Sequence, residues 1–290
     1  MHMKSNGTIR IAIQKSGRLS EGSVALLQSM GLSFETYQNR LFAPCRNLPI
    51  DILFIRDDDI PEYVRDGTAD LGIVGSNVLE EQGVRVRRVL PLDFGFCSLA
   101  VAVPEQQAWK SVEDLRSKRI ATSYPSTLRR FLTERGIPAE IVVLKGCVEI
   151  APTLRIADAI CDLVSSGSTL RTNRLRILET VAKSQAVLIG SQSVVAGKQP
   201  MLDKLLLRAR GAQEAKKYKY VLFNAPQAAL PSIQDLVPGD GGSAVIPLAG
   251  ADSSAVRIIV AEDRFWDVVE RIRALGGKDI LVTPIEKFIR

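Results

Sequence analysis

The residues best suited to chemistry follow a single short apolar segment. The run Ala159–Val164 (AICDLV) carries an acid at Asp162, and small hydroxyl residues then surround a glycine. Glycine lets the backbone approach a ligand closely, and successive N–H groups at a helix start attract an anion. The pattern predicts a phosphate cup made of Asp162, Leu163, Val164, Ser165, Ser166, Gly167, Ser168 and Thr169. A serine-rich turn that caps a helix fits the same spacing, so both interpretations stay open here.

A second candidate segment is the loop QKSGRL, directly after the predicted strand Ile9–Ile13. Ligands of open α/β sheets bind beyond the carboxyl ends of strands. Lys15 and Arg18 would there face anionic groups, and Gly17 would permit a tight turn. The alternative is an ordinary strand–helix loop with solvated cations.

Two weaker candidates also follow predicted strands. Arg56 precedes three acids, Asp57 to Asp59, which could bind ribose hydroxyls or Mg²⁺, although Asp59 also resembles a helix cap. The segment Ala121–Pro125, with Thr122, could form a pocket wall or simply turn the chain at Tyr-Pro.

The composition excludes several kinds of chemistry. The chain has 290 residues, and its one histidine, His2, precedes every patterned segment. A Ser-His-Asp triad, a Cys-His dyad, a histidine-ligated metal and a histidine general base are therefore not expected. The net charge is +6, with 6% aromatic residues and no long basic run. This balance favours small anionic ligands and predicts no nucleic-acid partner.

Cysteine spacing and hydropathy predict the cellular setting. The four cysteines, Cys45, Cys97, Cys147 and Cys161, form no C-x-x-C pair, so no zinc or redox motif is predicted. Free thiols suit a reducing cytosol. No apolar stretch reaches the length of a membrane span, and the polar N-terminus does not predict a signal peptide. We therefore expect a cytoplasmic protein with no membrane partner.

The elements that must position these residues alternate between strands and helices. Predicted strands are Ile9–Ile13, Ile50–Ile55, Leu71–Gly75, Leu99–Val103, Arg119–Ser123, Ile141–Leu144, Ala159–Val164 and Gln185–Ile189. A helix from Ser20 should end at Gly31, a capping box of Asp59 and Glu62 should start another, and a third should begin near Ser168. This alternation predicts an α/β fold with mostly parallel sheets and helices on both faces.

The end of the chain has a different pattern. A helix over Met201–Lys216 precedes strands at Lys219–Asn224, Val256–Val260 and Ile280–Thr283 and helices near Ala228–Leu236 and Arg264–Leu275. With one more strand before Val256, the order β-α-β-β-α-β predicts a ferredoxin-like domain that starts near Lys216.

Together these segments resemble the ATP phosphoribosyltransferase family over nearly the whole chain. The resemblance rests on the cup and on motifs in the family's order: IQKSGRL, PIDILFIRDDDIP, DLGIVGSNVLEE, LDFGFC, RIATSYP, VEIAP and LVTPIEKF. The length and the extra C-terminal domain are similar to the family's long form, which needs no separate regulatory subunit.

The resemblance implies a two-lobed catalytic core like a periplasmic binding protein. Lobe I would comprise residues 8–98 plus 184–214, lobe II residues 99–183, and a regulatory domain residues 216–290. The implied reaction transfers a phosphoribosyl group from phosphoribosyl pyrophosphate to N1 of ATP and releases pyrophosphate, at the first step of histidine biosynthesis. Mg²⁺ would travel with the pyrophosphate, without a dedicated metal site. Histidine would inhibit, and dimers would assemble into hexamers.

The resemblance also distributes roles among the residues. The cup Asp162–Thr169 would bind phosphoribosyl pyrophosphate, and Lys15, Arg18 and Glu149 would be catalytic, with Glu149 near ribose hydroxyls or the metal. ATP would contact Gly17, Arg56, Asp58 and Thr122. Asn224 and Ala244 would bind the inhibitor.

Some positions depart from the family pattern. Arg155 stands where the family has glycine, Thr153 where it has arginine, and Cys147 where serine is common. In the C-terminal domain, Ala244 stands where a threonine is usual, so histidine sensitivity is less firmly implied than catalysis.

Two alternatives remain open at this point. A type I phosphoribosyltransferase acting on a free base also has an acid followed by a hydroxyl-rich cup, but its motif usually carries two adjacent acids. A ligand-sensing paralogue without catalysis could share the two-lobed core.

Overall fold

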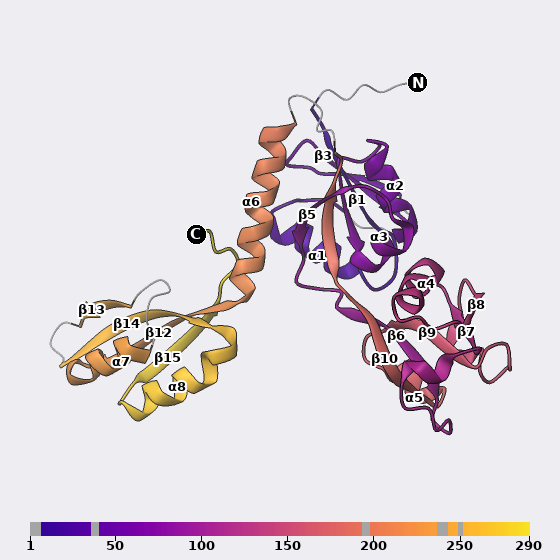
Figure 1. Ribbon diagram of the computed structural model, residues 1–290. Coiled ribbons are helices and arrows are strands. Elements are labelled where there is room, and N and C mark those ends of the chain that lie inside the picture. Colours follow the sequence, from indigo (N-terminus) through magenta and orange to yellow (C-terminus); the bar gives the residue numbers. More distant parts are fainter. Residues whose placement is uncertain (1–6, 36–40, 193–197, 237–242, 249–251) are drawn as a thin grey trace. The chain divides into compact units, whose positions relative to one another are not determined.

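The computed structural model describes residues 7–35, 41–192, 198–236, 243–248 and 252–290. The chain divides into two compact units, Met1–Ala25 with Ser33–Gln199, and Leu26–Leu32 with Pro200–Arg290 (Figure 1). Among the described residues, no helix is both long and apolar enough to cross a bilayer.

The first unit contains two sheets, and we name the sheets with their helices lobe I and lobe II. The lobe I sheet has the order β2-β3-β1-β4-β11-β5. Its strands are β1 (Ile9–Gln14), β2 (Phe42–Pro44), β3 (Ile50–Ile55), β4 (Leu71–Gly75), β5 (Arg87–Pro91) and β11 (Ala186–Gly190). Helices α1 (Ser20–Ser29), α2 (Ile60–Arg65) and α3 (Ser76–Gln82) follow β1, β3 and β4.

The lobe II sheet has the order β10-β6-β9-β7-β8. Its strands are β6 (Cys97–Pro104), β7 (Arg119–Thr122), β8 (Glu140–Val143), β9 (Ala159–Val164) and β10 (Leu175–Ser184). Helix α4 (Pro125–Glu134) buries Leu128, Phe131 and Leu132 against this sheet, a spacing that places all three on one helix face. The short elements η3 (Val148–Ile150) and α5 (Ser168–Thr172) come directly before and after β9 along the chain.

The expectation of mostly parallel sheets is wrong. Only β3-β1-β4 and β9-β7-β8 are parallel, and the remaining neighbours in both sheets are antiparallel. The cause is the chain path, because the chain leaves lobe I after β5, enters lobe II through β6, and returns through β10 into β11. Strands β2, β5 and β10 were not predicted, because β2 has three residues, β5 carries two arginines and β10 lacks strict alternation of apolar and polar residues.

The predicted capping box at Asp59 is also wrong. Asp59 does precede α2, but its backbone is already helical and its side chain makes no capping hydrogen bond. The acids Asp57–Asp59 instead form a 3₁₀ turn that runs directly into α2. A residue inside a continuing turn lacks the extended backbone that a side-chain cap requires.

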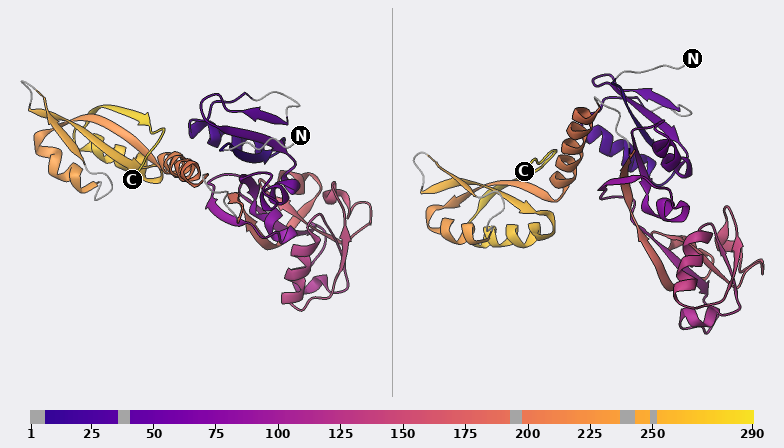
Figure 2. Two further views of the ribbon diagram at one scale, coloured as in Figure 1. Left: turned by 90° about the horizontal axis from the view of Figure 1, so that it is seen from above. Right: turned by 45° about the horizontal axis from the view of Figure 1, so that its top comes forward.

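The second unit contains α6 (Gln199–Lys216) and a four-stranded sheet. The sheet has the order β13-β14-β12-β15, from β12 (Tyr218–Pro226), β13 (Ala244–Pro247), β14 (Ser253–Ala261) and β15 (Lys278–Pro284). Helices α7 (Leu230–Leu236) and α8 (Phe265–Ala274) cover one face (Figure 2). Alternate residues of β14 are buried, as period-two patterning requires. The ferredoxin-like prediction is confirmed.

Candidate active site

The predicted cup forms a real cavity in lobe II. It has a volume of about 360 Å³, and all eight predicted cup residues line it. Leu170, Glu149 from η3 and Arg18 from lobe I complete the lining. The structure therefore brings together three segments that the sequence analysis treated separately, and one of them comes from the other lobe.

Local geometry explains the glycine at the centre of the cup. Gly167 has φ +73°, and a Cβ there would lie 3.3 Å from the Arg171 guanidinium. The same guanidinium donates to the Ser166 carbonyl at 3.2 Å, which closes the turn before α5. Helix α5 has only five residues, so exposed hydroxyl and N–H groups are the main anion donors here. The Ser166 and Ser168 hydroxyls lie 3.0 Å apart.

Two carboxylates face the cup. Burial raises the pKa of Asp162, and the nearby negative charge of Glu149 raises it as well. The Leu163 N–H, at 2.8 Å, and the positive charge of Arg18 act in the opposite direction. Such a pair can accept hydrogen bonds from ribose hydroxyls or share a cation. The described residues contain no group of three or more His, Cys, Asp or Glu side chains placed for a metal.

The QKSGRL loop presents its cations at the edge of lobe I. Gly17 has φ +106°, and a Cβ there would meet the Gln14 amide at 2.9 Å. Arg18 reaches across to the Cys97 sulfur at 3.2 Å, at the start of β6. Lys15 is exposed and does not line the cup. The structure therefore separates the two predicted cations, and only Arg18 lies at the cup.

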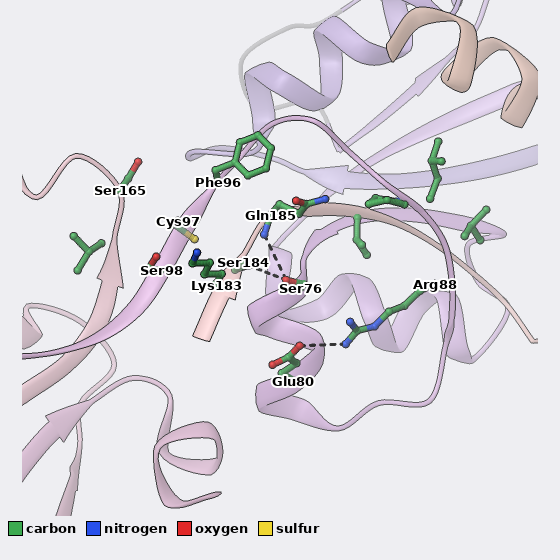
Figure 3. Close-up of a pocket in the computed structure, with 15 residues that line it drawn as sticks. Ser76, Glu80, Arg88, Phe96, Cys97, Ser98, Ser165, Lys183, Ser184 and Gln185 are labelled. Carbon is green, nitrogen blue, oxygen red and sulfur yellow. Dashed lines mark hydrogen bonds and ion pairs between the residues drawn. The ribbon is translucent and has the colours of Figure 1, made fainter. Parts of the chain in front are cut away.

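A larger cavity, of about 740 Å³, adjoins the cup and shares Val164 and Ser165 with it (Figure 3). Phe96, with 59% of its surface exposed, and Lys183 both line this larger cavity. The Arg88–Glu80 ion pair, at 3.6 Å, borders the far side. The sequence analysis missed this cavity because its lining comes from several distant segments. Two of the quoted motifs contribute to its lining, LDFGFC through Phe96 and Cys97 and DLGIVGSNVLEE through Ser76 and Glu80.

The residues predicted for ATP are dispersed. Gly17, Arg56 and Asp58 are exposed on lobe I loops and line neither cavity. Although the residue is exposed overall, partial burial of its carboxyl and the charges of Asp57 and Asp59 raise the pKa of Asp58. Thr122 is fully buried, and its hydroxyl donates to the Cys161 carbonyl at 2.7 Å and accepts from the Tyr124 N–H at 2.9 Å. Thr122 thus holds the turn that carries Tyr124 and exposes no surface to a ligand.

Tyr124 lies in the electric field of acids from both lobes. Burial is the main cause that raises its pKa, and the charges of Asp162, Asp57 and Asp58 add to it. The Asn77 amide of lobe I donates to its hydroxyl at 3.5 Å. The sequence pattern predicted for Tyr124 only a place in the Tyr-Pro turn.

Glu81 on α3 of lobe I binds the start of α4 in lobe II. Its carboxylate accepts from the N–H groups of Ser126 and Thr127 at 2.8 and 2.9 Å, and from the Thr127 hydroxyl at 2.8 Å. Helix α4 has no side-chain cap of its own, so Glu81 satisfies free N–H groups across the lobe boundary. We name this set of contacts the Glu81 latch.

The departures at 153 and 155 lie away from the cup. Thr153 and Arg155 line a different cavity of lobe II, with a volume of about 580 Å³. Arg155 has φ +58°, a backbone conformation that glycine adopts without strain. Cys147 is exposed, at φ +50°.

The inhibitor candidates share one face of the C-terminal sheet. The register pairs Asn224 with Ala255 and Ala244 with Arg257, and these positions alternate with the buried Phe223 and Val256. The Asn224 amide donates to Asp279 at 3.1 Å. Both candidates therefore lie on the face opposite α7 and α8.

The first unit consists of two mixed α/β lobes that the chain connects twice. A cup lined by hydroxyl groups lies beside these connections. Together these features define a two-lobed ligand-binding core with an appended ferredoxin-like domain. A family model for ATP phosphoribosyltransferase matches residues 56–211, and one for the HisG C-terminal domain matches residues 215–287. The chain belongs to the ATP phosphoribosyltransferase family, as the resemblance implied.

Solved structures agree with this assignment. An ATP phosphoribosyl transferase (HisG:HisZ) complex from Thermotoga maritima is 27% identical, with a TM-score of 0.61 over 70% of this chain and 96% of that chain. A periplasmic sulfonate-binding protein SsuA from Methylobacillus flagellatus KT is 17% identical, with a TM-score of 0.50 over 70% and 67%. The second likeness concerns the fold alone. Family membership makes the chain a phosphoribosyltransferase of the first step of histidine biosynthesis.

Proposed function

We propose that the chain transfers the 5-phosphoribosyl group of phosphoribosyl pyrophosphate to N1 of ATP. The bond from ribose C1 to pyrophosphate breaks with both electrons on the departing oxygen, and the N1 lone pair forms the new bond. The observation that carries the proposal is the shared lining of the 360 Å³ cup, where lobe II hydroxyls and acids meet Arg18 of lobe I.

Each part of the cup has a role in this reaction. The loop Ser165–Thr169 binds the 5′-phosphate through N–H and hydroxyl donors. Glu149 and Asp162 accept from ribose hydroxyls and stabilise the positive charge that develops on the ring. Arg18 neutralises the departing pyrophosphate. No proton has to leave N1 before it attacks, so the reaction requires no histidine base.

The site suits Mg²⁺ bound together with a substrate. Two carboxylates, Glu149 and Asp162, face the cup, and Mg²⁺ commonly combines one or two carboxylates with substrate phosphates and water. When bound, the ion would neutralise pyrophosphate charge.

The larger cavity suits the acceptor. Its exposed Phe96 offers a stacking surface for a purine ring, and Lys183 and Arg88 offer cations for a triphosphate. Arg56 and Asp58 would contact the acceptor only from the edge of lobe I, and Gly17 would shape the loop that carries Arg18.

The decisive experiment incubates the protein with ATP, phosphoribosyl pyrophosphate and Mg²⁺ and follows the absorbance of the N1 adduct. Ser166→Ala with Thr169→Val should raise the KM for phosphoribosyl pyrophosphate by about tenfold or more, since two hydroxyl donors to a charged group are lost. Thr133→Val, on the exposed side of α4, is the matched control. Wild-type kinetics in the double variant would refute the cup assignment. Activity on free bases instead of ATP would favour the type I alternative.

Regulation is a separate part of the proposal. Histidine would bind at the C-terminal domain near Asn224 and Ala244, in a homo-oligomer of dimers and hexamers without a separate regulatory subunit. A histidine titration of activity, followed by size-exclusion chromatography, tests this. Unchanged activity and size at millimolar histidine would exclude it.

A further inference from the structure

The 580 Å³ cavity of lobe II is distinct from both cavities assigned to the substrates. Its polar lining consists of Gln106, Thr153, Arg155, Thr172, Asn173 and Arg174. The volume lies within the usual range for small-molecule sites. We propose that this cavity binds a small phosphate ester and that its occupancy changes the affinity of the cup for phosphoribosyl pyrophosphate. The second half of this proposal rests on the proposed function of the cup.

The charge of the residues that line this cavity indicates the class of ligand. Arg155 and Arg174 line the cavity, and none of its lining residues is acidic. The nearest acid along the chain, Glu105, is not part of the lining and contacts Arg174 through its backbone N–H. Two guanidinium groups with the Thr153 hydroxyl match the several oxygens of a phosphate group. The Thr172 hydroxyl and the Asn173 amide donate to the Ser168 and Thr169 carbonyls at 3.1 and 2.9 Å.

Both arginines have a positive backbone φ angle. Arg155 and Arg174 have φ +58° and +52°, which places both in the left-handed region where side chains other than glycine are disfavoured. Both positions are held by hydrogen bonds. The Arg155 carbonyl accepts from the Arg119 guanidinium at 3.0 Å, and the Arg174 carbonyl accepts from the Glu105 N–H at 2.9 Å. Positive φ also occurs at Ser117, Cys147 and Asp279, so the two arginines are distinguished by sharing one cavity without acidic lining residues rather than by φ alone.

The same two segments that build this cavity also build the cup. Residues Ser168 and Thr169 at the start of α5 line the cup, whereas Thr172 at its end and Arg174 just beyond it line the second cavity. Glu149 lines the cup, whereas Thr153 and Arg155, a few residues later in the same turn, line the second cavity. A ligand that favours one conformation of these short segments changes the affinity at their other end, and such coupling is reciprocal.

The test titrates sn-glycerol 3-phosphate by calorimetry into protein already saturated with phosphoribosyl pyrophosphate, without ATP. Wild type should bind one equivalent per chain, and the affinity for phosphoribosyl pyrophosphate should change at least threefold when the ester is present. Arg155→Gly with Arg174→Gly should weaken the ester at least tenfold. Glycine suits both backbone conformations, so this variant keeps the fold.

The matched control is Arg116→Ala with Arg129→Ala, which removes the same charge from exposed positions of lobe II that line neither cavity. It should bind the ester like wild type. Equal weakening in both double variants, or no saturable binding to wild type, would overturn the site. Unchanged affinity for phosphoribosyl pyrophosphate would overturn the coupling. Binding of a hexaglutamate peptide but not of the ester would overturn the site in favour of a protein partner.

A failure of the proposed function is distinguishable from a failure of this site. If phosphoribosyl pyrophosphate does not bind, the ester is titrated into Ser166→Ala with Thr169→Val, whose cup is impaired. Saturable binding that Arg155→Gly with Arg174→Gly removes in that background would retain the site without its link to catalysis.

Discussion

The two lobes contribute opposite chemistry to one site. Lobe I offers cations on exposed strand-end loops, and Arg18 is the one that reaches the cup. Lobe II offers a contiguous loop of hydroxyl groups with two acids beside it. The proposed substrate carries phosphates on a ribose, so we expect it to use both sets of groups. The proposed function therefore predicts that the relative position of the lobes affects catalysis.

Removing the contribution of lobe I should have the largest effect. Arg18→Ala should lower kcat/KM by about 100-fold, the usual cost of losing one preorganised charge donor at a developing anion. Steady-state kinetics with both substrates measures it. Arg65→Ala, which removes an exposed cation of α2 in the same lobe, should stay within twofold of wild type. A similarly small loss in Arg18→Ala would show that lobe II suffices.

Replacing Asp162 of lobe II should change activity and stability in opposite directions. Burial raises the pKa of Asp162, so the folded chain holds this proton more tightly than the unfolded chain. Above the ordinary value of 3.8, ionised Asp162 therefore destabilises the fold, and Asp162→Asn should stabilise it at pH 7 while lowering activity at least tenfold.

The size of the stability gain in Asp162→Asn depends on pH. Well below pH 3.8 both states of wild type are protonated, so the gain should vanish there, appear as the pH rises, and level off above the folded-state pKa. Urea unfolding across this range measures the gain. A gain that is largest in acid would contradict the burial argument.

Breaking the Glu81 latch tests the link between the lobes. Glu81→Ala leaves two N–H groups of α4 without their acceptor and should cost about 1–2 kcal/mol of unfolding free energy, as the loss of a helix cap does. Because Glu81 positions the lobes and touches no substrate, kcat should fall more than the KM for either substrate rises. Interlobe distances from paired spin labels should broaden.

The latch prediction has two controls. Glu62→Ala removes a surface carboxylate of α2 and should change stability by less than about 0.5 kcal/mol. Glu81→Gln, which keeps one acceptor oxygen, should fall between wild type and Glu81→Ala. An unchanged distance distribution in Glu81→Ala would mean that the latch does not set the lobe position.

The smallest effect is expected within lobe II, outside the cup. Arg155→Gly should stabilise the protein by at most about 1 kcal/mol, because glycine adopts φ +58° without the clash of a side chain. Arg155→Ala retains the Cβ and should not share the gain. Thermal unfolding distinguishes the two. Without added sn-glycerol 3-phosphate, both should keep the wild-type KM for phosphoribosyl pyrophosphate, since Arg155 does not line the cup.

These contrasts also show which features of the fold and of the candidate site the sequence could predict. The cup was predictable because its residues are contiguous, and their turn geometry depends on local features such as Gly167. The position of Thr122 at a strand end was predictable too, but its burial was not, because burial depends on β9 lying beside β7. The larger cavity, the Glu81 latch and the separation of Arg155 from Glu149 all depend on which distant segments meet.

The sequence by itself determined the β-α-β-β-α-β order of the C-terminal domain and the residues of the cup, and it predicted a small anionic ligand. Composition and local periodicity report charge, burial and turn chemistry, which are properties of neighbours along the chain. Only the tertiary structure decided the strand directions and the two crossings between lobes. It also decided that Arg18 rather than Lys15 reaches the cup. An alternating pattern marks which face of a strand is buried, but it carries no information about the strand that pairs beside it.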